Sequence, residues 1–221
     1  MPIILPDSTG VGAAFKDLQD EVLAHGFDAA VYRTRVKNYL NEAQARVARR
    51  VQIRQLEQTD FLTTTPATQT VGIPTGIIRL RSVEDTSINQ NLALVQITDI
   101  DQASTSSGRP ASYAISGATL LLYPTPDAAY TLQIRYWRGS TVMVDDTDVT
   151  DLPSDYGNLL ISYALYRCYR SEDDVQMAQF YFTEWNRDLG QLVNDLQFPD
   201  VEPRRIPDPW HDAPLRRGWT L

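Results

Sequence analysis

The sequence is poor in the residues that build disulfides and transition-metal sites, with one cysteine, Cys168, and two histidines among 221 residues. A single cysteine excludes an internal disulfide and a zinc site made of several thiolates. Because its sequence neighbours are apolar, we expect Cys168 to be a small buried hydrophobic residue. His25 and His211 stand alone, and each is expected at the surface or at a helix end rather than as a catalytic base or ligand. The sequence therefore predicts neither a metal nor a cofactor.

Long apolar runs and an excess of positive charge are missing too. No stretch approaches the roughly 20 residues of a membrane span. The opening residues MPIILPDSTG lack the basic region and the apolar length of a signal peptide, so we expect folding in the cytosol and no membrane contact. With 20 Lys and Arg against 28 Asp and Glu, the net charge is −8. A general nucleic-acid binder normally carries a basic surface, which argues against that class but allows weak, sliding contact with DNA.

Recognisable catalytic motifs are also missing. A dinucleotide-binding fingerprint fails because Phe15 takes the place of its last glycine, and the sequence has neither a GxxxxGK phosphate loop nor a GxSxG nucleophile elbow. The acidic run of residues 145–151 does not fit a calcium loop, since Asp151 stands where the loop needs glycine. We expect these acids to solvate a linker and to favour the start of the next helix, with Asp151 or Ser154 as its cap.

Helical patterns occupy both ends of the chain. A short first helix is predicted from Phe15 to Leu23, with a capping signal at residues 6–9 before it and Gly26 after it. A second helix is predicted from a cap at Asp28 to about Glu57. Its apolar positions recur at steps of three and four: Tyr32, Val36, Leu40, Ala43, Val47 and Val51.

Two further helices joined by a short turn are predicted between residues 152 and 198. The first, from about Leu152 to Arg170, is apolar on nearly every side, so it must be covered on more than one side. The segment 171–174 resembles a capping box, which predicts that a new helix begins there. The apolar positions of that helix have the spacing of a seam that packs lengthwise on another helix: Val175, Ala178, Phe182, Trp185, Leu189, Leu192 and Leu196.

The middle of the chain favours β structure. β-Branched and aromatic residues gather in short segments separated by turn residues: 76–83, 92–97, 111–115, 118–123 and 130–137. The last of these alternates, as a strand with one buried face does. The segment Gln133–Arg138 is also a candidate for stacking nucleic-acid bases, although the net charge favours plain sheet packing.

This order of elements predicts an α+β protein. Residues 1–57 and 151–198 are expected to form a helical bundle, because each set of terminal helices needs a partner. Residues 58–150 are expected to form an inserted small antiparallel β module with linkers. Residues 199–221, in which proline recurs, are expected to form an extended C-terminal arm.

Two groups of residues are candidates for contact with other molecules. The second helix carries Arg46, Arg49, Arg50 and Arg54 away from its apolar positions. They either grip phosphates or an acidic partner or, as we favour, reflect the preference of cations for a helix C-terminus. The arm carries arginines and apolar anchors, which dominate interface hot spots, so it either lies on another surface or folds back on its own domain. Its candidate binding residues are Arg204, Arg205, Ile206, Trp210, Leu215, Arg216, Arg217 and Trp219.

Three phrases in succession resemble the head-to-tail adaptor, or connector, proteins of tailed bacteriophages. They are RVKNYLNEAQ at residues 35–44, LYPTPD at 122–127 and DLPSDY at 151–156, the last followed by the tyrosine-rich helix. The resemblance spans about Asp28 to Leu196. Proteins of this family are helical bundles with a β insertion, which agrees with the fold predicted from the residue patterns.

The resemblance implies a structural virion protein rather than an enzyme. Members of the family form a ring, usually of twelve copies, beneath the portal vertex, where they extend the DNA channel and provide the attachment surface for the tail or nozzle. The implied partners are the portal protein, a tail or nozzle protein and other copies of the chain, with phage DNA passing through without specific binding. The implied location is the virion neck, after assembly in the host cytoplasm.

The resemblance also assigns roles to the two groups of candidate residues. The arm would bind the portal or a neighbouring subunit. The helix of residues 175–196 is then either the cover of the central helix or part of the seam to the next copy. The possible subunit interface draws on Arg46, Arg50, Arg54, Tyr163, Tyr166, Phe182, Trp185 and Leu189.

Two alternatives belong to other classes. The first alternative is a soluble assembly factor or interaction module that is absent from the finished virion. The second is a cell-wall hydrolase with Asp145, Asp146 or Glu172 as acid and base. The hydrolase is disfavoured because these acids lie in a predicted linker and a predicted cap.

Overall fold

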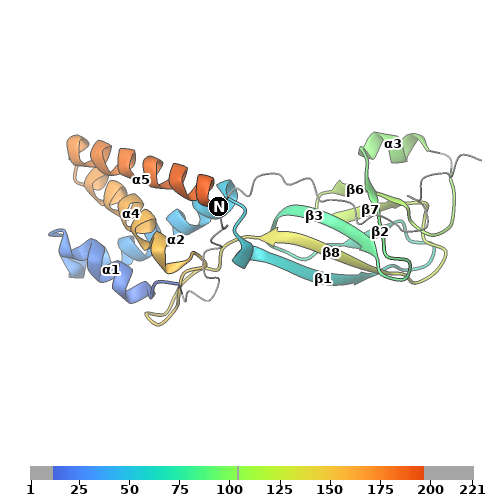
Figure 1. Ribbon diagram of the computed structural model, residues 1–221, viewed down its shortest axis with the longest axis horizontal. Coiled ribbons are helices and arrows are strands. Elements are labelled where there is room, and N and C mark those ends of the chain that lie inside the picture. The colour runs from blue at the N-terminus through green and yellow to red at the C-terminus, as the bar shows by residue number, and fades with distance from the viewer. Residues whose placement is uncertain (1–11, 104, 197–221) are drawn as a thin grey trace, which may run out of the picture.

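A computed structural model describes residues 12–103 and 105–196 of the chain. The molecule is elongated, with four helices at one end and the strands at the other (Figure 1). The four helices are α1 (Phe15–Ala24), α2 (Ala29–Arg50), α4 (Gly157–Ser171) and α5 (Val175–Leu196). This arrangement confirms the predicted α+β class. The predicted C-terminal arm at residues 199–221 lies outside the described residues.

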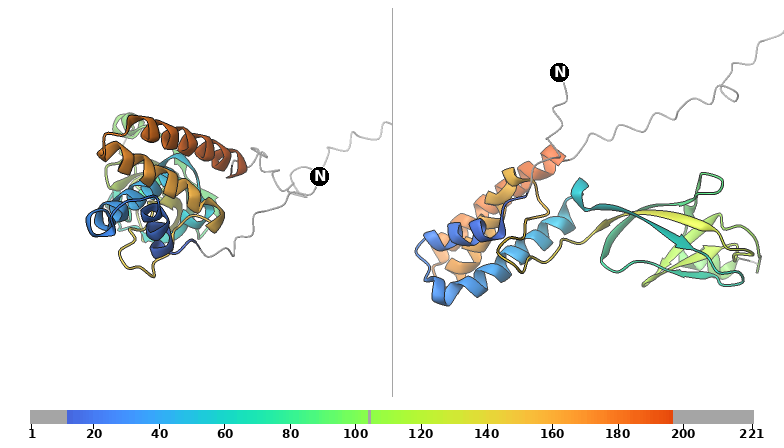
Figure 2. Two further views of the ribbon diagram at one scale, coloured as in Figure 1. Left: turned by 90° about the vertical axis from the view of Figure 1, so that its left-hand side faces the viewer. Right: turned by 90° about the horizontal axis from the view of Figure 1, so that it is seen from below.

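Helix α4 is the centre of the bundle, because it packs against α1, α2 and α5. The left view of Figure 2 shows the molecule from its helical end. The predicted apolar stripe of α2 is buried from Tyr32 to Val51, and the side chain of Asp28 accepts a hydrogen bond from the backbone N–H of Ala30 at 2.8 Å, which confirms the predicted cap. Cys168 on α4 is fully buried, as its apolar neighbours predicted. The predicted cap of the first helix at residues 6–9 lies outside the described part of the chain.

The prediction that the second helix runs to Glu57 is wrong. Helix α2 ends at Arg50, Val51 is extended, and a short 3-10 turn, η1 (Arg54–Leu56), leads into strand β1 (Glu57–Thr63). Strand β1 pairs with its neighbour along its whole length, so the sheet supplies the backbone hydrogen bonds that a longer helix would have supplied.

The turn between α4 and α5 also differs from its prediction. Ser171 belongs to α4 and its hydroxyl donates to the carbonyl of Cys168, so it does not cap α5. The cap is Asp174, whose carboxylate accepts a hydrogen bond from the N–H of Met177 at 3.0 Å. Val175, predicted to lie in the apolar seam, is 76% exposed because the helix begins there, beyond the surface that α4 covers.

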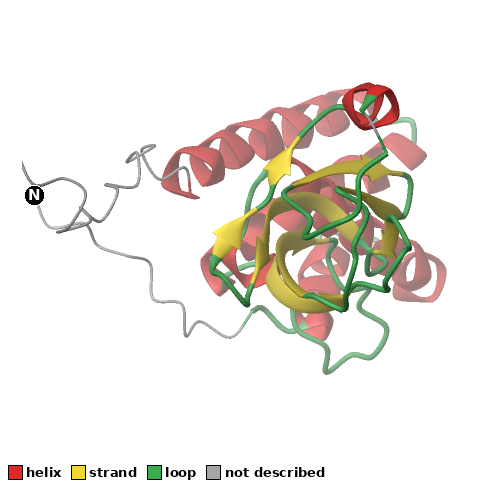
Figure 3. Cartoon of the chain, turned by 90° about the vertical axis from the view of Figure 1, so that its right-hand side faces the viewer, coloured by secondary structure: helices red, strands yellow, loops and turns green. Residues whose placement is uncertain are grey.

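The strands form two four-stranded sheets around a second apolar core, seen from the far end of the molecule in Figure 3. The first sheet has the order β1-β8-β3-β4, with β3 (Ile77–Asp85), β4 (Gln90–Asn91) and β8 (Thr131–Arg138). The second has the order β2-β7-β6-β5, with β2 (Thr70–Gly72), β5 (Ala93–Leu94), β6 (Ser112–Ser116) and β7 (Thr119–Tyr123). All pairs are antiparallel except β5 with β6, which is parallel.

The predicted strand at residues 92–97 is shorter than expected. It ends at Leu94, and Ile97 begins a six-residue helix, α3 (Ile97–Gln102). The reason is a reciprocal capping box, in which the Asp99 carboxylate accepts from the backbone N–H of Gln96 while the Gln96 side chain accepts from the third residue of the helix.

The acidic linker does not cap α4, so that prediction is wrong. The carboxylate of Asp151 pairs with Arg138 at 2.9 Å and accepts from the N–H of Thr141 at 2.6 Å. Neither α4 nor the 3-10 turn before it, η2 (Ser154–Tyr156), has a side-chain cap. Two simultaneous partners, one of them a cation, hold Asp151 more strongly than a single helix amide would.

The same linker is bound to the bundle rather than merely solvated. Asn41 exchanges hydrogen bonds with both backbone groups of Met143, at 2.8 and 2.9 Å. Gln44 donates to the carbonyl of Thr141 at 2.8 Å and accepts from the N–H of Asp151 at 3.0 Å. The residues after β8 are therefore fixed along α2 before the chain enters α4.

Candidate interaction surfaces

Aromatic rings and arginines share the side of the bundle where α2 and α5 flank α4. The Tyr163 ring lies 5.2 Å from the Trp185 ring, and the Phe182 ring packs on the Tyr166 ring at 5.1 Å. Two arginines of α2 cover these rings: Arg46 stands 5.3 Å above Tyr163 and Arg50 stands 5.4 Å above Trp185. We call this surface the basic flank and define it by Glu42, Arg46, Arg50, Tyr166, Arg167, Arg170 and Phe182.

Glu42 is the centre of polar contacts on the basic flank. Its Oε1 accepts from the Tyr163 hydroxyl at 2.8 Å and from Arg46 at 2.9 Å, and lies 3.5 Å from Arg167. Partial burial raises the pKa of Glu42, but the bonds from Tyr163 and Arg46 and the charge of Arg167 outweigh it, so the pKa is lowered overall. Burial, and then the bond to Glu42, raise the pKa of Tyr163 to about 12. Both residues therefore hold one charge state at neutral pH, which suits a structural contact.

The predicted interface residues divide into a buried and a surface group. Tyr163, Trp185 and Leu189 are at most 5% exposed within the single chain, in the core shared by α2, α4 and α5. Tyr166 and Phe182 are half-buried around them. Arg46 and Arg50 are exposed and lie over the aromatic rings, whereas Arg54 is exposed on the η1 turn beyond the end of α2. Only the surface group is open to another molecule.

The hydrogen-bond centre at Glu42 was missed by the sequence analysis. The signal available was its spacing from Arg46, because residues four apart lie on one helix face and pair as these two do. Tyr163 and Arg167 come from α4, so no local pattern around Glu42 predicts their contact with it.

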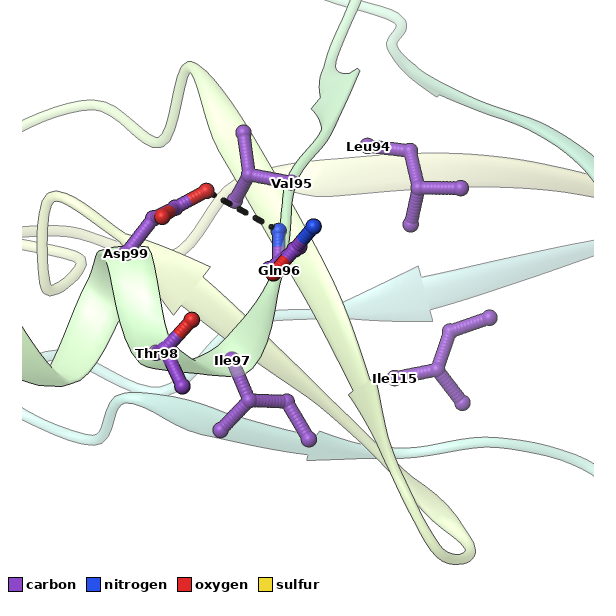
Figure 4. Close-up of a pocket in the computed structure, with 7 residues that line it drawn as sticks. All are labelled: Leu94, Val95, Gln96, Ile97, Thr98, Asp99 and Ile115. Atoms are coloured by element: carbon purple, nitrogen blue, oxygen red, sulfur yellow. Dashed lines mark hydrogen bonds between the residues drawn. The ribbon is translucent and has the colours of Figure 1, made fainter.

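A second candidate surface is an open apolar hollow of about 720 Å³ at the tip of the β module. Figure 4 shows its walls, which come from β5, the start of α3 and strand β6. Leu94 is 63% exposed, and Ile97 and Ile115 are about two-fifths exposed. The sequence alone does not predict this surface, because its residues have the pattern of ordinary strand positions and their exposure depends on how β5 meets α3.

The strand residues considered for base stacking contribute to sheet packing, as favoured from the sequence. Ile134 and Tyr136 are buried in the core between the sheets. Trp137 is half-buried against the bundle core, with Arg81 5.7 Å above its ring, while Arg135 is exposed.

The carboxylates considered for hydrolysis are held apart by different partners. Asp146 pairs with Lys37 at 2.9 Å, and Glu172 accepts from the Tyr32 hydroxyl. Lys37 and Tyr32 are five positions apart on α2, so they lie on different sides of that helix. Within residues 12–103 and 105–196, no group of three or more His, Cys, Asp and Glu side chains is placed to hold a metal ion. No helix in those ranges is long and apolar enough to cross a membrane.

The fold and these surfaces define an elongated interaction protein, in which a four-helix bundle carries charged and aromatic surface at one end and a β module carries an apolar hollow at the other. A family model described as SU10 adaptor protein matches residues 13–216. The chain therefore belongs to the SU10 adaptor protein family, which makes it a structural adaptor of a bacteriophage rather than a member of an enzyme class. No curated protein matches the sequence.

Proposed function

We propose that the protein is a ring-forming head-to-tail adaptor of the virion neck. It docks beneath the portal, extends the DNA channel and provides the attachment surface for the tail or nozzle. The observation that carries this proposal is the family match over residues 13–216, which spans the bundle, the β module and most of the segment 199–221. A ring of twelve copies, assembled in the host cytoplasm, is the form proposed.

The shape and the charge of the molecule support this role. An adaptor needs contact surfaces for two different assemblies, and the bundle and the tip of the β module lie at opposite ends of an elongated chain (Figure 1). The net charge of −8 disfavours tight binding of DNA phosphates. DNA therefore passes such a ring with little adhesion.

The C-terminal segment supplies a second part of the proposal. Residues 199–221 lie outside the described part of the chain, and most of them fall within the family match. We assign portal or neighbour binding to its tryptophans and arginines, since these residue types dominate interface hot spots. The residues concerned are Arg204, Arg205, Ile206, Trp210, Leu215, Arg216, Arg217 and Trp219.

Electron microscopy of the purified protein mixed with portal rings tests the function. A second ring added to one end of the portal is the expected result, and its symmetry gives the number of copies. Portal rings that remain bare at saturating protein would contradict the proposal. Mass spectrometry of purified virions separates a neck component from a soluble assembly factor, because only the former stays in the particle.

A deletion tests the role of the C-terminal segment. A chain ending at residue 198 keeps both cores described above, so it should fold and give the helical circular-dichroism signal of the full chain. It is expected to lose portal binding in a pull-down. Unchanged binding would show that the segment is not the gripping element.

A further inference from the structure

Helix α5 presents two different sides to the surface of the bundle. Phe182 contacts Tyr166, and Trp185 lies under Arg50, so these positions mark the side that faces α2. Tyr181 marks the other side: its ring lies 5.9 Å from the ring of His25, which follows α1, and its hydroxyl is 3.3 Å from His25 Nδ1. Residues three, seven and fourteen positions after Tyr181 share that second side.

The side marked by Tyr181 is acidic. Glu184, Asp188 and Asp195 follow Tyr181 at those spacings, and Glu21 lies four positions before His25 on α1. Arg187 pairs with Glu184 at 3.6 Å and with Asp188 at 3.1 Å while remaining 63% exposed. We call this surface the acidic flank and define it by Glu21, Glu184, Arg187, Asp188 and Asp195. Four acids and one arginine give it a charge of −3.

The basic flank carries the opposite charge. Its four arginines and one glutamate give +3, and Arg50 and Arg170 are exposed. It also offers apolar surface, since Phe182 is half-buried and Val175, seven positions earlier on the same side of α5, is 76% exposed. Arginine beside exposed aromatic and aliphatic groups is typical of protein interfaces and is more than a phosphate contact needs.

We propose that the basic flank of one copy docks on the acidic flank of the next copy. The inference rests on the proposed function and specifies its subunit contact. The two surfaces lie on different sides of α5, belong to one chain and carry charges of +3 and −3, so each copy offers what its neighbour requires. A contact between two different faces repeats head to tail, and it closes into a ring when the rotation between copies allows it.

Charge reversal of each flank tests the pairing. One variant, Arg50→Glu/Arg170→Glu, makes the basic flank negative, and another, Glu21→Lys/Glu184→Lys, makes the acidic flank positive. Each alone sets like charges against each other, so association should weaken at least tenfold in sedimentation velocity and in native mass spectrometry of portal-bound copies. Glu84→Lys/Asp101→Lys is the matched control, because it changes the net charge as the acidic-flank variant does but lies in the β module.

The pairing predicts two rescues that a purely structural role does not. An equimolar mixture of the two reversed variants should assemble, because opposite flanks then meet at every contact in alternating order. A single chain that carries all four substitutions should also assemble. The proposal is overturned if neither the mixture nor the chain with all four substitutions assembles. It is also overturned if the single-flank variants assemble as strongly as the wild type.

Two further measurements keep the test decisive. Arg50 covers Trp185, so if its reversal unfolds the chain, Val175→Glu takes its place: this exposed position should leave the circular-dichroism signal unchanged and weaken association. A 50-base-pair DNA duplex tests the competing partner of the basic flank, which is nucleic acid. The proposal is overturned if the basic flank binds the duplex and Val175→Glu leaves the association between copies intact.

Failure of this pairing and failure of the proposed function give different results. Copies that assemble with the predicted rescues but never add to portal rings uphold the flank pairing and contradict the adaptor ring. Portal rings that fill equally with wild type and with the reversed variants uphold the adaptor and overturn the pairing. A wild-type chain that assembles in neither setting overturns both.

Discussion

Trp185 is the largest side chain that the bundle buries almost completely, at 2% exposure, and its truncation separates a core role from an interface role. It packs on the ring of Tyr163 at 5.2 Å, on the ring of Phe182 at 5.9 Å and under the Arg50 guanidinium. All of these partners belong to the same chain. The structure therefore predicts that Trp185→Ala weakens the monomer itself.

The expected loss combines removed apolar area with an unfilled cavity. Tryptophan-to-alanine changes in cores cost about 3–5 kcal/mol, a large share of the ~5–15 kcal/mol that stabilises a typical domain. The indole Nε1 of Trp185 is buried without a hydrogen-bond partner among the described residues. A buried unpaired donor costs about 1–3 kcal/mol, so Trp185→Phe removes a cost while it removes volume. We expect Trp185→Phe to cost less than about 2 kcal/mol, which makes it the matched control.

Urea unfolding followed by helical circular dichroism measures the effect without relying on tryptophan fluorescence. The free energy of unfolding should fall by about 3–5 kcal/mol for Trp185→Ala and far less for Trp185→Phe, with unchanged dependence on urea. A loss below about 1 kcal/mol, together with lost association between folded copies, would refute the core assignment and place Trp185 in the subunit seam.

Three further predictions follow from contacts in the bundle. A Cβ at Gly12 would lie 2.1 Å from the carbonyl oxygen of Thr150, so Gly12→Ala should destabilise the chain by about 1–3 kcal/mol in the same urea assay. The control Gly190→Ala lies in open space on α5 and should stabilise the chain slightly. Equal effects of the two substitutions would contradict the close approach at Gly12. The pKa of Glu42 is lowered from its ordinary value of 4.5, so Glu42 contributes to the free energy of unfolding above that pH, and this contribution is lost as the pH falls through its lower pKa in the folded state. Glu42→Gln should therefore lose less stability than the wild type during acid unfolding. Parallel curves for the two proteins would refute this. Burial raises the pKa of the Cys168 thiol to about 12, so a thiol reagent such as Ellman's reagent should label Cys168 only after the chain unfolds. Rapid labelling of the folded chain would contradict the burial of Cys168.

The sequence predicted the parts of the fold that repeat along the chain. The stripe of α2 from Tyr32 to Val47 and the alternation in β8 follow from helix and strand periodicity, and both were placed correctly. The all-apolar character of α4 correctly predicted a helix covered on several sides, since three helices surround it. These features need only local spacing.

The two errors about helix caps arose where other contacts compete for the capping residue. Asp151 had the sequence context of a helix cap, but Arg138 and the Thr141 amide offer it two bonds from outside that context. Ser171 lost the capping position to Asp174 for a local reason, because α4 continues through it and its hydroxyl donates to the carbonyl of Cys168. Local spacing identifies the candidates for a cap, and the contacts of the folded chain decide among them.

The candidate surfaces were also predicted only as far as local spacing allows. The arginines at positions 46 and 50 were identified from the sequence, yet their role over Tyr163 and Trp185 depends on the packing of three helices. Of the predicted interface residues, Trp185 and Leu189 turned out to be buried within the chain, because a seam between helices of one copy and a seam between copies have the same spacing.

The two ends of the molecule are held in a fixed relation by the way the β module is inserted. The connections enter and leave through β1 and β8, which are paired neighbours in one sheet, with Glu57 opposite Trp137. Trp137 also packs against the bundle core, and Arg138 pairs with Asp151 on the linker that Gln44 binds to α2. Two adjacent strands anchored at their base resist bending more than two separate linkers do. The candidate surfaces of the bundle and of the β tip are therefore presented at a set spacing, as the proposed adaptor role requires.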